Sequence, residues 1–189
     1  MSGALHPSRR IACRLAITGL VSVWGSAFAA DDTLQAPNVV AISASLVTSG
    51  QPSRGALAKL SAQGFGAVIY LAPPTVANAV PGEADIVRKQ GLEFVNIPIE
   101  FGNPTEADFQ SFVEAMNRLR DRKVLVHCQV NMRASSMTFL YRVIIGRENP
   151  EQAYESVARV WSPQGPWRAL LVAQLPSPES RSSRTRVRQ

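Results

Sequence analysis

The chain has 189 residues, of which 46% are hydrophobic and 18% are charged, so it can bury one core and is not a disordered chain. The formal net charge of +6 comes from the two ends, because residues 1–30 hold three arginines and no acid, and residues 177–189 hold four arginines and one glutamate. The body between them is neutral, which removes the electrostatic basis for binding nucleic acid.

The first thirty residues have the layout of a secretory signal peptide. Residues 1–14 are basic and free of acids, residues 15–24 form an apolar run, and Ala27 and Ala29 place small residues where a signal peptidase cleaves. The apolar run is about half of the roughly 20 residues that a membrane-spanning helix needs. We therefore expect residues 1–29 to be a signal peptide cleaved near Ala29, no stable membrane span, and an exported, periplasmic protein.

Hydrophobic periodicity and turn residues predict alternating strands and helices along the rest of the chain. Strands are expected within residues 39–47, 67–71, 92–99 and 123–128. Helices are expected after the caps Ser53, Thr105 and Asn149, and over residues 81–90, 132–145 and 167–175. This alternation predicts an α/β fold with a mainly parallel central sheet and helices on both faces. Sites in such sheets form at the carboxyl ends of the strands, here residues 71–74, 98–102 and 127–133.

These elements predict a single domain over residues 30–175 and a disordered basic tail over residues 176–189. After signal-peptide cleavage, the only cysteine would be Cys128 and the only histidine would be His127, which are neighbours. A single cysteine cannot form an internal disulfide. The Cys128 thiol is therefore either a buried packing residue or a reactive group.

The segment from His127 to Arg133 joins the last predicted strand to a helix through a short loop. The backbone N–H groups of such a loop and the helix dipole can hold an anion at one point, and a thiol placed there is held as the reactive thiolate. Arg133 can grip two oxygens of a tetrahedral anion, and Asn131 suits the positive φ that a tight loop needs. His127 would orient the loop and stabilise the thiolate, or simply make a structural hydrogen bond. The predicted anion-binding loop comprises Gln129, Val130, Asn131, Met132 and Arg133, with Cys128 at its base.

The pattern of His127 and Cys128 followed by a short loop and Arg133 resembles the active-site loop of cysteine-dependent tyrosine and dual-specificity phosphatases. A longer stretch, residues 45–167, is similar to the small bacterial family described as beta-lactamase-hydrolase-like phosphatase-like domains. Four segments carry this resemblance: residues 48–53, 68–71, 96–99 and 126–128. The resemblance implies a cysteine-phosphatase-like fold, Cys128 as the nucleophile that becomes phosphocysteine, and Arg133 as the residue that binds phosphate and stabilises its transition state.

Two features depart from the usual phosphatase loop. That loop has five residues between Cys and Arg, whereas this chain has four, and its Arg is followed by a hydroxyl residue, whereas here Ala134 precedes Ser135. The four-residue spacing is shared with the phosphatase-like family, which commonly has Gly at the position of Asn131, and is similar to that of rhodanese sulfurtransferases. Three hypotheses follow: an exported phosphatase acting on phosphate monoesters, a sulfurtransferase using a Cys128 persulfide, and a non-catalytic anion-binding module.

Cleavage of a phosphate ester also needs an acid to protonate the leaving oxygen. Glu100, two residues after Pro98, lies where the acid loop of the phosphatases would be, although it can equally be a solvated loop carboxylate. Asp108 is the alternative acid, but a capping box with Thr105 explains it better. Ser135 is a candidate supporting residue of the loop. No cluster has metal-ligand spacing and no Gly-rich nucleotide loop is present, so we expect no metal or cofactor, and a phosphorylated small molecule or protein as substrate.

Overall fold

The computed structural model describes residues 34–175. The signal peptide predicted over residues 1–29 and the tail predicted over residues 176–189 lie outside the described residues. Within residues 34–175, no helix is long and apolar enough to cross a membrane.

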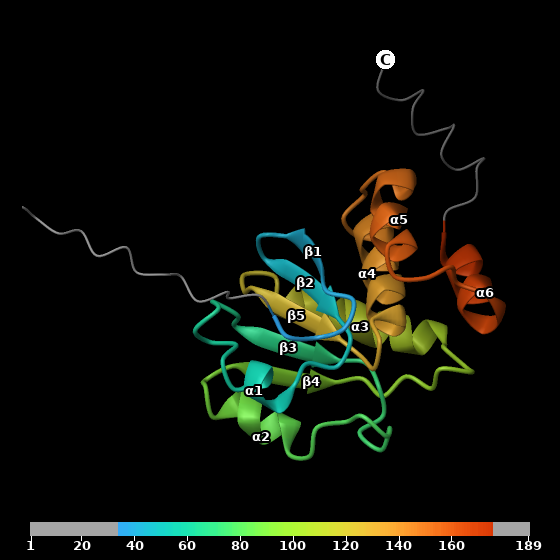
Figure 1. Cartoon of the computed structure of the whole chain (residues 1–189). Coiled ribbons are helices and arrows are strands. Elements are labelled where there is room, and N and C mark those ends of the chain that lie inside the picture. The colour runs from blue at the N-terminus through green and yellow to red at the C-terminus, as the bar shows by residue number, and fades with distance from the viewer. Residues whose placement is uncertain (1–33, 176–189) are drawn as a thin grey trace, which may run out of the picture. The chain divides into compact units, whose positions relative to one another are not determined.

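Five short strands form one sheet in the order β1-β2-β5-β3-β4 (Figure 1). The strands are β1 (Val40–Ser43), β2 (Leu46–Ser49), β3 (Ala67–Tyr70), β4 (Glu93–Asn96) and β5 (Val124–His127). β1 pairs antiparallel with β2, and the other three pairings are parallel. The predicted mainly parallel sheet is confirmed, and the region expected to hold one or two strands is a hairpin of two.

Helices cover both faces of this sheet (Figure 1). On one face lie α1 (Arg54–Leu57) and α2 (Glu83–Arg88). On the other lie α3 (Glu106–Arg118), α4 (Met132–Ile144), α5 (Pro150–Ala158) and α6 (Gly165–Gln174). Successive strand residues point to opposite faces, so Leu125 of β5 packs with α1 and α2, while Val124 and Val126 pack with the other helices. Burial on both faces explains why β5 is a continuous apolar run.

Two predicted elements are shorter than expected. The strand predicted over residues 92–99 pairs in the sheet only as far as Asn96. Beyond it the N–H of Ile97 still donates to the Tyr70 carbonyl, but the chain then turns, since the N–H of Ile99 donates to the Ile97 carbonyl at 2.9 Å. The helix after Ser53 ends at Leu57 and continues as turns. The predicted caps are confirmed: the side chains of Ser53, Thr105 and Asn149 each accept a hydrogen bond from a backbone N–H of the helix that follows.

Candidate functional site: an anion-binding loop at the carboxyl edge of the sheet

The three strand-end segments predicted to hold the site lie together. The carbonyl of His127, the last residue of β5, accepts a hydrogen bond from the N–H of Leu71 after β3 at 2.8 Å. Nε of Arg133 donates to the carbonyl of Ile99, after β4, at 2.9 Å. These two bonds join the end of β5 and the start of α4 to both neighbouring segments.

Cys128 lies at the base of the loop as a free, fully buried thiol. Its backbone N–H donates to the carbonyl of Ser49, the last residue of β2, at 3.3 Å. Ser135, the predicted supporting hydroxyl, donates to the carbonyl of Met132 at 3.2 Å rather than to the thiol.

Asn131 has the left-handed conformation that the sequence predicts for this position, with φ of 73°. Its side chain is fully buried and donates to the carbonyl of Asn38 and, at 3.1 Å, to Oγ1 of Thr48. Asn131 thus turns the chain into α4 and attaches the loop to β2 and to the turn before β1.

The carbonyls of Gln129 and Val130 point away from the centre of the loop. The carbonyl of Gln129 accepts from the N–H of Gln51 at 3.0 Å and from Nδ2 of Asn78 at 3.3 Å, and that of Val130 accepts from Nδ2 of Asn38 at 3.0 Å. In a trans peptide the N–H points opposite to the C=O, so the N–H of Val130 faces away from Gln51. Four loop N–H groups have no acceptor within residues 34–175, those of Gln129, Val130, Met132 and Arg133.

Gly50 allows the loop to approach β2 this closely. A Cβ at this position would lie 2.9 Å from the carbonyl oxygen of Gln129, inside van der Waals contact. Any side chain here would push the loop away from the backbone of Gln51. This contact accounts for a glycine in the segment at residues 48–53, which carries part of the family resemblance.

Arg133 is a buried cation in the first turn of α4, with 4% of its surface exposed. Nε donates to Ile99, Nη1 donates to Oε1 of Gln129 at 3.2 Å, and the guanidinium lies 5.0 Å from the centre of the Phe101 ring. These bonds use two of its five N–H groups. Within residues 34–175, no carboxylate oxygen lies within 4.0 Å of Arg133. A buried charge without a counter-charge is unfavourable, so the arrangement favours an anionic ligand.

The segment that carries Glu100 is held over Arg133 by aromatic packing. Phe101 contacts Trp161 and Trp167 at ring-centre distances of 5.8 and 5.9 Å, and Nε1 of Trp167 donates to the Phe101 carbonyl at 2.9 Å. Glu100 is exposed, and its carboxylate has no partner among the described residues. The Glu100 side chain is therefore exposed, and it directly follows Ile99, whose carbonyl accepts a hydrogen bond from Arg133.

The Asp108 side chain caps the N-terminus of α3 together with Thr105. Its Oδ2 accepts from the backbone N–H of Thr105 at 2.8 Å and from the Thr105 hydroxyl at 2.7 Å, and its own N–H donates to Thr105 Oγ1 at 3.1 Å. The capping box expected from the sequence is confirmed. These bonds leave the Asp108 carboxylate engaged with the helix cap.

His127 lies behind the loop and contacts a residue that the sequence did not single out. Its fully buried ring stacks on Tyr70, with ring centres 4.8 Å apart, and its Nε2 lies 2.7 Å from Oε1 of Glu83. An acid in the first turn of a helix ordinarily complements the helix dipole, so no local pattern distinguishes Glu83. Burial, followed by the charges of Glu83 and Cys128, raises the pKa of Tyr70 to about 12, against a smaller lowering by Arg133.

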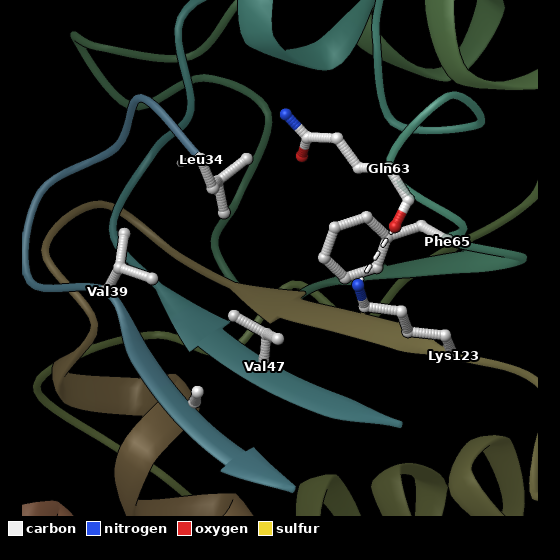
Figure 2. Close-up of a pocket in the computed structure, with 7 residues that line it drawn as sticks. Leu34, Val39, Val47, Gln63, Phe65 and Lys123 are labelled. Atoms are coloured by element: carbon white, nitrogen blue, oxygen red, sulfur yellow. Dashed lines mark hydrogen bonds between the residues drawn. The ribbon is translucent and has the colours of Figure 1, made fainter. Parts of the chain in front are cut away.

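Neither of two pockets among the described residues contains the loop. One, at the opposite end of the strands, has a volume of about 320 Å³ and is lined mainly by apolar side chains. In its lining, Lys123 donates to the Gln63 carbonyl at 2.9 Å, and Figure 2 shows these side chains around the pocket. The other, of about 280 Å³, is lined in part by Tyr70, Glu83 and Phe94. Across residues 34–175, no three His, Cys, Asp or Glu side chains are grouped as a metal site requires.

Residues 23–166 match the family model described as "DSP-PTPase phosphatase fused to NAD+ Kinase". A curated relative, the beta-lactamase hydrolase-like protein of Xylella fastidiosa strain Temecula1, is 33% identical over 112 residues, which are 58% of this chain and 26% of that protein. The chain therefore spans about a quarter of the length of the curated relatives it matches.

Solved structures are similar over most of the domain. A DUF442 protein of Shewanella putrefaciens CN-32 is 30% identical with a TM-score of 0.67, covering 74% of this chain and 91% of that one. The core catalytic domain of the PP-IP phosphatase SIW14 from S. cerevisiae is 11% identical with a TM-score of 0.63, covering 82% and 96%. Together with the family match, these similarities confirm the predicted resemblance and the cysteine-phosphatase-like fold.

Proposed function

The chain belongs to the family of DSP-PTPase phosphatases described as fused to NAD+ kinase, and from this premise we propose that it hydrolyses phosphate monoesters through a phosphocysteine on Cys128. The observation that carries the proposal is the buried guanidinium of Arg133, which has three free N–H groups and no carboxylate partner in the described chain. A phosphate dianion would compensate this charge and accept from the free loop N–H groups.

In the first step, the Cys128 thiolate attacks phosphorus. The S–P bond forms as the P–O bond to the leaving group breaks, and the electron pair of that bond passes to the leaving oxygen. Arg133 and the loop N–H groups hold the three equatorial phosphate oxygens, over which the negative charge is spread in the transition state. Glu100 gives its proton to the leaving oxygen, so that an alcohol departs.

In the second step, water attacks the phosphocysteine. The Glu100 carboxylate takes a proton from this water as its oxygen bonds to phosphorus. The P–S bond breaks, its electron pair returns to Cys128 as the thiolate, and inorganic phosphate leaves. Both Glu100 and Cys128 are restored to their starting states.

The proposal is tested by hydrolysis of an aryl phosphate by the full-length chain and its Cys128→Ser variant. We expect turnover by the wild type and none by the variant, which lacks the nucleophile. Mass spectrometry of the acid-quenched wild type should find phosphate on the peptide that contains Cys128. A wild type that leaves the ester intact but forms thiocyanate from thiosulfate and cyanide would instead be the sulfurtransferase.

Glu100→Gln tests the acid separately. It should lower turnover of the aryl phosphate several-fold, within the range expected for loss of a general acid. Glu106→Gln is the matched control, because Glu106 is an exposed residue of the α3 first turn, and it should leave turnover unchanged. Equal rates for both variants would remove Glu100 as the proton donor.

Export is a second part of the proposal and is supported by the basic start, the apolar run and the small residues within residues 1–30. The substrate would then be a phosphorylated small molecule or protein outside the cytoplasm. In a bacterial host with a periplasm, the periplasmic fraction should contain a chain that begins at residue 30 or 31. A chain found only in the cytoplasmic fraction with an intact N-terminal segment would contradict export.

A further inference from the structure

A buried carboxylate, Glu83, lies behind the anion-binding loop and takes no part in the two steps above. It is the first residue of α2, and 6% of its surface is exposed. Carboxylates are rarely buried to this degree unless hydrogen bonds or an opposite charge compensate them. The neighbours of Glu83 therefore indicate why the fold keeps it there.

Two side chains contact the two oxygens of this carboxylate. Nε2 of Gln51 donates to Oε2 at 2.8 Å, and Nε2 of His127 lies 2.7 Å from Oε1. At this distance two lone pairs would repel, so the contact favours a proton on Nε2 of His127. The ring N–H does not point along the line of a good hydrogen bond, so attraction between opposite charges is the main stabilising interaction of the pair.

The ionisable groups around the stacked rings of Tyr70 and His127 come from four segments of the chain. Glu83 belongs to α2, Arg133 to α4, Cys128 follows β5, and Tyr70 belongs to β3. β2, on the other side of β5, places only the uncharged Ser49 beside His127. Burial, and then the charges of Glu83 and Cys128, raise the pKa of Tyr70 to about 12, so Tyr70 is neutral at physiological pH.

A count of these charges favours a proton on His127. The buried carboxylate of Glu83 brings a negative charge, and among the described residues Arg133 makes no ion pair with it within 4.0 Å and is also needed by a bound anion. An imidazolium at His127 supplies a positive charge and compensates the carboxylate that it contacts. Arg133 is then left for the ligand.

Gln51 connects Glu83 to the other side of the thiol. Its side chain donates to Glu83, while its backbone N–H donates to the carbonyl of Gln129 at 3.0 Å. His127 precedes Cys128 in the chain and Gln129 follows it. Glu83 therefore contacts, directly or through Gln51, the residues on both sides of the nucleophile.

We propose that Glu83 is a positioning residue that keeps His127 protonated behind the loop and thereby holds Cys128 as a thiolate near neutral pH. The catalytic consequence rests on the proposed function. The reactivity of Cys128 toward an alkylating reagent follows from the ion pair alone, whichever reaction the thiol performs. If the wild type hydrolyses no phosphate ester but Glu83→Gln is still alkylated more slowly than the wild type, the phosphatase proposal is rejected and the inference about Glu83 stands.

The test is alkylation of the full-length chain by iodoacetamide from about pH 5 to about pH 10, read by mass spectrometry of the peptide that contains Cys128. Glu83→Gln is compared with Glu106→Gln, which makes the same change at the exposed first residue of α3. Relative to wild type, Glu83→Gln should slow alkylation about tenfold near pH 6 and very little near pH 10, where the thiol is ionised in every variant. The profile of Glu106→Gln should coincide with wild type.

Convergence of the rates at high pH separates a change in ionisation from a loss of access, which would slow alkylation by one factor at every pH. The proposal is overturned by such a uniform loss, by coincident profiles of the two variants, by faster alkylation of Glu83→Gln, or by a wild-type thiol that does not react.

A second measurement on the ring of His127 does not depend on the folding of Glu83→Gln. In a His6→Gln chain, where His127 is the only histidine, ¹⁵N NMR should show protons on both ring nitrogens near neutral pH. A neutral ring would overturn the proposal.

Discussion

The N-termini of α3 and α4 differ in what accepts hydrogen bonds from their first backbone N–H groups. At α3, the side chains of Thr105 and Asp108 each accept from the other's backbone N–H, so the start of the helix is closed by its own residues. At α4, Asn131 makes no side-chain cap and turns its amide toward Asn38 and Thr48 instead. Among the residues that the structure describes, the N–H groups of Met132 and Arg133 have no acceptor, and they lie beside the buried guanidinium of Arg133. A helix start that is left open next to an uncompensated cation is arranged for a ligand, whereas a capped one is structural.

The largest expected effect comes from removing the planar guanidinium at the open start. Arg133→Lys should lower kcat for an aryl phosphate about 10²- to 10³-fold, because lysine keeps the charge but cannot donate two parallel hydrogen bonds to phosphate. Inhibition by inorganic phosphate should weaken in the same variant. The control Arg118→Lys, at the exposed end of α3, should keep both values. A kcat within a few-fold of wild type would show that Arg133 does not bind the transferred phosphate.

The conformation at residue 131 is tested by comparing Asn131→Gly with Asn131→Ala. Both lose the bonds to Asn38 and Thr48, but only glycine adopts a φ of 73° without strain. Asn131→Ala should therefore unfold with a free energy about 1 kcal/mol lower than Asn131→Gly, measured by urea denaturation. Its kcat should also be the lower of the two. Equal stability would mean that the loop does not need the left-handed conformation.

The closed start of α3 should matter for stability alone. Thr105→Ala removes the cap and should lower the free energy of unfolding by about 1 kcal/mol, while kcat for an aryl phosphate stays within about twofold of wild type, as expected for a cap remote from the reacting atoms. Urea denaturation and steady-state kinetics on the same preparation check both statements. A large loss of kcat at nearly unchanged stability would place Thr105 in the site.

The last prediction concerns Tyr70, which stacks on His127, and its effect appears only at alkaline pH. Its pKa is about 12 in the folded chain and 10.0 as a reference, so between these values the unfolded chain loses the proton first and stability falls as pH rises. This component is fully present below about pH 10. Between about pH 9 and 11.5, the free energy of unfolding of wild type should therefore fall by about 1 to 2 kcal/mol more than that of Tyr70→Phe, after allowance for solvent screening. Urea denaturation at both pH values measures the difference, and Tyr154→Phe, at an exposed position, should follow wild type.

Local patterns were sufficient for the loop and the helix starts. The apolar run of β5, the unusual conformation of Asn131 and the capping box of Thr105 depend on residues close together in the chain, and each was predicted correctly. The end of β4 was placed too late, because a proline does not show where its neighbours stop pairing in a sheet. Glu83 was missed because its own helix explains an acid at that position, while its partner His127 belongs to another element.

The sequence by itself determined which elements form and that a cysteine, a tight turn and an arginine follow one another at the end of a buried strand, since these depend on periodicity and on the intrinsic properties of each residue. Only the tertiary structure decided that Arg133 is buried without a carboxylate partner in the described chain, and that Glu83 and Gln51 lie behind the thiol. Those contacts join segments far apart in the chain. They arise from the register of the parallel strands and the packing of α2 and α4 on opposite faces of the sheet.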